Sequence, residues 1–155
     1  MEKLESKALR FVGLLSRTIN SRSDFKYKQL GLQKGQYMFL TRVCENPKIN
    51  LVDLSNMLKV DKATTTKAIK KLIDIGYINK KQNEKDKREY RLTPTNKGLQ
   101  IYKLIINEEK KQLDISFDGF NEDEIEMATK LIERMSKNIE KYWLDAGNSL
   151  GKMEL

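Results

Sequence analysis

The chain has no histidine, one cysteine and two prolines among its 155 residues. The absence of histidine excludes His-based acid–base catalysis, Ser-His and Cys-His nucleophile pairs, and every zinc site except one built from carboxylates and a single thiol. A single cysteine excludes a disulfide within the chain and fits a reducing compartment. We therefore expect a protein that is not an enzyme and that uses no metal or other cofactor.

Long apolar runs are missing as well, because the longest contain four or five residues and none could span a membrane. The first ten residues, MEKLESKALR, carry acids and lack the long apolar centre of a signal peptide, so we expect a cytoplasmic protein. Apolar residues make up 39% and charged residues 34% of a chain that is long enough for one sizeable core. These values favour a single, helix-rich domain.

The formal net charge of +8 is concentrated in the middle of the chain. Residues 59–91 contain eleven cations and five anions, a net charge of +6. Residues 121–145 contain four cations and seven anions, a net charge of −3. This asymmetry indicates a polyanionic partner for the centre of the chain.

The pattern of residues 51–76 predicts two short helices joined by a tight turn. Apolar residues recur at helical spacing over 51–58, and Asn50 can cap the N–H groups ahead of them. Asp61 is placed to cap a second helix, whose apolar stripe ends at Gly76. That stripe packs inward and leaves a polar, basic side.

Hydroxyl and lysine side chains in the first turns of the second helix are typical of a helix whose start enters the major groove of DNA. The candidates for contacts at or near base edges are Lys62, Ala63, Thr64 and Lys67. Thr65, a further candidate, is ambiguous, because at least one of Thr65 and Thr66 should pack against the preceding helix. Lys70 and Lys71 are candidates for phosphate contacts. Taken alone, the helix could instead be a solvated basic face.

A basic hairpin follows this helix. Tyr77 and Ile78 begin one strand, Tyr90 and Leu92 alternate on the other, and polar residues 82–87 join them. The tip contributes the candidate DNA contacts Lys85, Asp86, Lys87 and Arg88. The lysines would meet phosphates and Arg88 the minor groove, while Asp86 could hold the Arg88 guanidinium by a charge-assisted bond or simply form the turn.

The run DKATTTKAIKKLIDIGYINKKQNEKDKREYRLTPTNKG resembles the recognition helix, wing and following helix of the MarR (multiple antibiotic resistance regulator) family of transcription factors. The likeness extends over nearly the whole chain, and one departure is Pro94, where the family usually has an apolar residue. The matching motifs are the L-x-x-x-G-x-I step at Leu72, Gly76 and Ile78, the D-x-R wing at Asp86 and Arg88, and the T-x-x-G at Thr95 and Gly98.

The resemblance implies a mainly helical α+β fold, with residues 1–155 forming one winged helix-turn-helix domain of the MarR type. Residues 34–94 would bind DNA, and residues 1–22 and 95–146 would form a helical dimerisation layer. The implied protein is a homodimer that regulates transcription, most simply as a repressor, by reading a palindromic operator in double-stranded DNA. In this family a small, often phenolic ligand or an oxidant shifts the spacing of the two DNA-binding parts and releases the DNA.

The flanking segments predict amphipathic helices that are too apolar for a lone DNA reader. An intertwined homodimer is therefore preferred over packing within one chain. The expected elements are a helix over 4–19, a polar loop over 21–35, a helix over 34–46, a long helix over 95–115, a break at 117–120, and a last helix over 122–144.

Two further features leave alternatives open. A cleft lined by Phe11, Leu15 and Tyr37 is a candidate effector pocket, although aromatic residues at helical spacing can equally be core. Cys44 lies on an inward helix face and is expected to be a core residue, with a redox-sensing thiol as the sharper alternative. A winged-helix module that binds an acidic protein is the alternative to a DNA reader.

Overall fold

The computed structural model of the protein describes residues 6–84 and 86–147 and divides into two compact units, Met1–Gln112 and Leu113–Leu155. The described elements are mostly helical, which confirms the expected fold class. In chain order they are α1 (Ala8–Tyr27), the 3-10 turn η1 (Lys28–Leu30), α2 (Gln36–Glu45), α3 (Leu51–Leu58), α4 (Lys62–Asp74), β1 (Ile78–Gln82), β2 (Tyr90–Pro94), α5 (Asn96–Ser116) and α6 (Glu122–Gly147). None of the described helices is long and apolar enough to cross a lipid bilayer.

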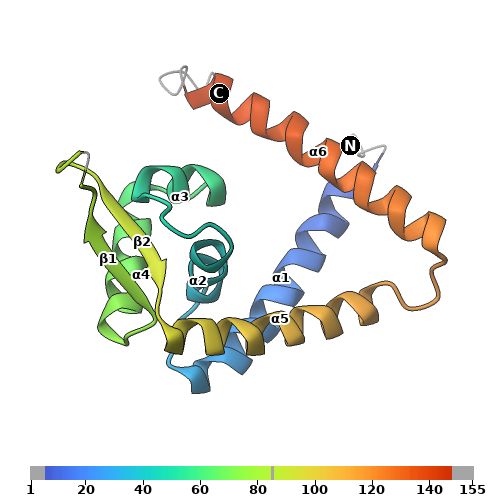
Figure 1. The fold of residues 1–155 in the computed structure, drawn as a ribbon. Coiled ribbons are helices and arrows are strands. Elements are labelled where there is room, and N and C mark those ends of the chain that lie inside the picture. Colours follow the sequence, from blue (N-terminus) through green and yellow to red (C-terminus); the bar gives the residue numbers. More distant parts are fainter. Residues whose placement is uncertain (1–5, 85, 148–155) are drawn as a thin grey trace. The chain divides into compact units, whose positions relative to one another are not determined.

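The helices α2, α3 and α4 gather with the hairpin of β1 and β2 around one hydrophobic core (Figure 1). The strands pair antiparallel with Ile78 opposite Pro94, and Ile49, just before α3, forms an isolated bridge to Leu92. Side chains that are at most 2% exposed include Leu40, Val43, Leu54, Ile69, Leu72, Ile78 and Leu92. The hairpin is thereby fastened both to α4 and to the segment that leads into α3.

The starts of α3 and α4 are set by capping side chains. The Asn50 side-chain oxygen accepts a hydrogen bond from the Asp53 backbone N–H at 2.8 Å. The Asp61 carboxylate accepts one from the Thr64 backbone N–H at 2.9 Å and one from the Thr64 hydroxyl at 2.7 Å. Both predicted caps are confirmed, because each satisfies backbone N–H groups that have no partner within the helix.

The prediction of a loop over 21–35 is wrong in its first part, because α1 begins at Ala8 and continues to Tyr27. Ser23 and Tyr27, one turn apart, are buried against α5. Gln112 of α5 donates a hydrogen bond to the Ser23 hydroxyl at 3.2 Å, and the Tyr27 hydroxyl donates to the Ile105 carbonyl at 3.4 Å. Contacts distant in the sequence therefore hold this polar segment helical.

The start of α5 is locked to the segment that links α4 to β1. The Thr95 hydroxyl donates to the Gly76 carbonyl at 2.7 Å and accepts the Gly98 backbone N–H at 3.0 Å. The Thr95 backbone N–H donates to the Tyr77 carbonyl at 3.0 Å. A Cβ at Gly98 would lie 2.1 Å from that same Tyr77 oxygen, so only glycine allows this approach. The T-x-x-G motif thus has a structural cause.

We expect Gly98→Ala to lower the free energy of unfolding by about 1–3 kcal/mol, because the Tyr77 backbone must move to admit a methyl group. Urea unfolding of the purified variant measures this. Gly13→Ala within α1 is the matched control, since its Cβ would meet only the Arg17 guanidinium, at 3.2 Å. The control should be neutral or stabilise by about 0.5–1 kcal/mol; equal unfolding curves for the two variants would refute the packing argument.

Candidate nucleic-acid interface

Helix α4 turns its apolar residues into the core and leaves its polar start open to solvent. Four of the sequence-predicted contacts in its first turns are exposed: Lys62, Ala63, Thr64 and Lys67. Further along, Lys70 is exposed, whereas Lys71 is half-buried and its ammonium donates a hydrogen bond to the Gln33 side chain. The exposed positions form a compact basic surface at the helix start.

Thr65 does not belong to this surface. It is 0% exposed, between α3 and α4. The Ser55 hydroxyl donates to its Oγ1 at 2.9 Å, and its own hydroxyl donates to the Asp61 carbonyl at 3.0 Å. The inclusion of Thr65 among the DNA contacts was therefore wrong: it holds α4 on α3, while its neighbour Thr66 is exposed.

The hairpin tip presents Lys87 and Arg88 to solvent, whereas Lys85 lies outside the described residues. The Asp86 carboxylate accepts a hydrogen bond from the Arg88 backbone N–H at 2.9 Å, and the Asp86 carbonyl accepts the Glu89 N–H at 3.0 Å. Asp86 therefore bonds the Arg88 backbone and not its guanidinium. Of the two roles considered for Asp86, the structure supports the turn-former, so the orienting role is corrected.

Glu89, which was not predicted from the sequence, joins the hairpin to α3. Its carboxylate accepts hydrogen bonds from the side chains of Asn50 at 2.7 Å and Asn83 at 2.5 Å, and it pairs with the Arg91 guanidinium at 2.7 Å. The Asn83 hydrogen bond, with smaller contributions from Asn50 and Arg91, holds the pKa of Glu89 below its ordinary value. Because Asn50 also caps α3, this acid ties the turn end of the hairpin to the start of α3.

The predicted effector pocket is not formed by its three residues. Tyr37 is 5% exposed and its hydroxyl donates to the Asn20 side chain at 2.7 Å, whereas Phe11 and Leu15 are exposed on α1. Tyr37 is thus a core residue, which was the alternative to a pocket-lining role.

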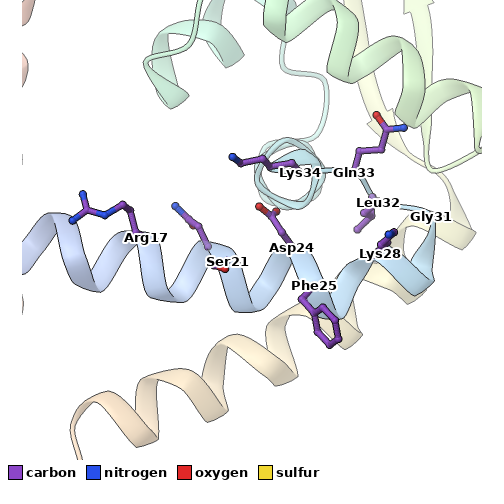
Figure 2. A pocket seen from close by; sticks show the side chains of 10 residues that line it. Arg17, Ser21, Asp24, Phe25, Lys28, Gly31, Leu32, Gln33 and Lys34 are labelled. Atoms are coloured by element: carbon purple, nitrogen blue, oxygen red, sulfur yellow. The ribbon is translucent and has the colours of Figure 1, made fainter.

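A cavity of about 960 Å³ lies further along α1, where it meets the loop before α2 (Figure 2). Its lining includes Arg17, Ser21, Asp24, Lys28, Gln33 and Lys34.

Cys44 is half-buried and packs against the hydrophobic core. Burial, and secondarily the nearby Glu45 carboxylate, raise the pKa of its thiol to about 11. Because the thiolate is the reactive form, this environment favours the core role over redox sensing. Among the described residues, no group of three or more His, Cys, Asp or Glu side chains is placed to hold a metal ion.

The arrangement of a support helix, a polar-faced second helix and a basic hairpin defines a winged helix-turn-helix DNA reader. The family model named MarR family matches residues 32–90. The chain is also 39% identical over 135 residues to the HTH-type transcriptional regulator YybA of Bacillus subtilis, covering 87% of this chain and 90% of that protein. The chain therefore belongs to the MarR family of DNA-binding transcriptional regulators.

Solved structures agree along nearly the whole length. A MarR protein from Peptoclostridium difficile is 60% identical with a TM-score of 0.88, covering 94% of this chain and 95% of that one. A MarR family regulator from Listeria monocytogenes, solved in complex with a 26-mer DNA, is 37% identical with a TM-score of 0.89 and covers 100% of both chains. The winged-helix fold expected from the sequence is confirmed.

Glu89→Gln should lower the free energy of unfolding at neutral pH, because an amide lacks the charge that Arg91 and the two asparagines bind. Since the folded-state pKa of Glu89 is depressed, its contribution is present above the ordinary carboxyl pKa and is lost as pH falls through the depressed value. Urea unfolding of wild type and variant from neutral to acidic pH should show a difference that shrinks on acidification.

Glu84→Gln is the matched control, because it removes one negative charge from the same hairpin at an exposed position. We expect this control to leave the unfolding curve unchanged. The proposed role of the Glu89 charge in linking the hairpin to α3 would be ruled out by either of two results. One is a loss of unfolding free energy in Glu89→Gln that does not change with pH, and the other is an equal loss in Glu84→Gln.

Proposed function

We propose that the protein is a homodimeric, cytoplasmic repressor that reads a palindromic operator. Each copy places the start of α4 in a major groove, with the two half-sites about 34–36 Å apart on one face of the duplex. The observation that carries this proposal is the exposed polar start of α4, which the buried Ser55–Thr65 contact holds rigidly on α3.

The proposed contacts divide by chemistry. Lys62, Ala63, Thr64 and Lys67 lie at or near base edges; because the Thr64 hydroxyl donates to Asp61, its methyl group is the part free to touch a thymine methyl. Arg88 enters the minor groove beside the hairpin. Lys70, Lys71, Lys85 and Lys87 meet phosphates, which fix register without reading sequence.

The dimer would be formed by residues 1–22 and 95–146, with residues 34–94 as the reader. Large apolar side chains along α1 support this, since Leu9 and Phe11 are 71% and 65% exposed. On α6, Met127, Ile132 and Ile139 are exposed as well. Exposed large apolar side chains on both helices indicate a partner, and two-fold homodimers are the commonest solution.

Release by a small phenolic effector is part of the proposal. A phenolate needs an apolar wall with a cation beside it, and the cavity along α1 offers the cationic Arg17 and Lys34 (Figure 2). This cavity replaces the Phe11, Leu15 and Tyr37 cleft as the candidate site.

The decisive experiment selects bound sequences from a random pool of duplexes and then titrates the selected operator. On that operator, Arg88→Ala should weaken binding by about 1–3 kcal/mol while the variant remains folded and dimeric. Lys130→Ala on α6 removes one positive charge elsewhere and is the control for net charge. Unchanged affinity of Arg88→Ala would contradict the minor-groove role, and equal binding to an acidic peptide would favour a protein-interaction module.

Lys87→Ala should instead lower the slope of log affinity against log salt concentration by about one unit for each half-site, because one phosphate contact is lost. Base preference, measured on single-substitution operators at fixed salt, should stay as in wild type. A relaxed preference would show that the division into phosphate and base contacts is incorrect.

A further inference from the structure

Phe25 on α1 is 85% exposed, and no other large apolar side chain among the described residues is more exposed. Its side chain is also one of those that line the cavity along α1, together with Arg17, Ser21 and Asp24 (Figure 2). Such an aromatic side chain has the size and rigidity of an interface anchor.

The surroundings of Phe25 are basic. An open hollow of about 600 Å³ beside it is lined by Arg22, Lys26 and Lys28. Glu108 of α5, buried beneath, pairs with Lys26 and lies 3.9 Å from Arg22. Three cations against this one contacting acid leave the rim with an excess of positive charge.

The second unit holds a surface of the opposite character at the start of α6. An open hollow of about 410 Å³ there has an apolar floor that includes Phe120, Met127 and Leu131. These three side chains are 49%, 56% and 42% exposed. Asp123 and Glu124 stand at its rim, and residues 117–129 contain no lysine or arginine.

We infer that Phe25 of one copy inserts into the α6 hollow of a second copy. The Phe25 ring meets the Met127 thioether and the Phe120 ring, both favourable neighbours for an aromatic side chain. Around it, the basic rim of α1 faces the acidic rim of α6, which fixes the register of the contact.

A second copy is the occupant because each chain carries both halves, so that two-fold symmetry repeats the contact twice and leaves neither half open. The inference rests on the proposed homodimer and defines one anchor within it. Its failure is separable from failure of the homodimer, because the oligomeric state and the individual contact are measured independently.

Engineered cysteines test the contact in the full-length protein with Cys44→Ala as background. Phe25→Cys and Met127→Cys chains, one of them carrying a mass tag, are mixed and oxidised with diamide, so that each chain has a single thiol. We expect a disulfide-linked pair containing one chain of each kind. Ile139→Cys, also exposed on α6 but outside the hollow, is the matched control and should give at least tenfold less of the mixed pair.

Two outcomes overturn the contact. One is equal cross-linking of the Met127→Cys and Ile139→Cys chains. The other is a disulfide confined to single chains when Phe25→Cys and Met127→Cys are placed on one polypeptide, which would mean that Phe25 fills the hollow of its own chain.

Sedimentation of wild type and Phe25→Ser completes the test, because the exposed position leaves folding intact, as urea unfolding verifies. We expect the dimer dissociation constant to rise at least tenfold, whereas Val52→Ser, at an exposed site on α3, should leave it unchanged. If the wild type is a dimer and Phe25→Ser does not weaken it, the proposed contact is wrong but the homodimer stands. If the wild type is a monomer, both the proposed contact and the homodimer are wrong.

Discussion

The close approach of Gly98 to the Tyr77 carbonyl is the constraint on which the reader's geometry depends. Thr95 bonds both Gly76 and Gly98 at this point, and the Tyr77 hydroxyl donates to the Leu30 carbonyl at 2.6 Å. The end of α4, the start of β1, the start of α5 and the turn after α1 therefore share one backbone junction. A displacement of α5 cannot leave the recognition helix and the hairpin behind, because packed backbone contacts are not continuously deformable.

Three consecutive threonines, Thr64, Thr65 and Thr66, have different structural roles at the start of α4. Successive side chains of a helix are rotated by about 100°, so neighbours of identical chemistry face different surroundings. Thr64 completes the cap with Asp61, Thr65 is sealed under Ser55, and Thr66 faces solvent. The hydroxyls of Thr64 and Thr65 thus hold the helix in place, and the Thr64 methyl group and Thr66 remain at the exposed surface.

The sequence predicted what is local and missed what depends on distant partners. The bounds of α3 and the caps Asn50 and Asp61 follow from a few adjacent residues. The winged helix-turn-helix as a whole could be predicted from such local patterns. The extension of α1 depends on Gln112 and Ile105, about 80 residues away along the chain. The sequence predicted that Thr65 or Thr66 would pack against the preceding helix, and the contact with Ser55 shows that it is Thr65. Glu89 could have been suspected, since an acid in the most basic segment needs local partners.

Three of the five acids in that basic segment, Asp61, Asp86 and Glu89, lie on the two elements that would meet phosphate. Asp61 accepts two hydrogen bonds at the start of α4, Asp86 accepts the Arg88 N–H in the turn, and Glu89 binds Arg91 and two asparagines. Their negative charge is thus directed at donors within the protein, which weakens repulsion toward a polyanion. These three acids bond groups of the reader itself, and Lys62, Lys67, Lys87 and Arg88 stay exposed.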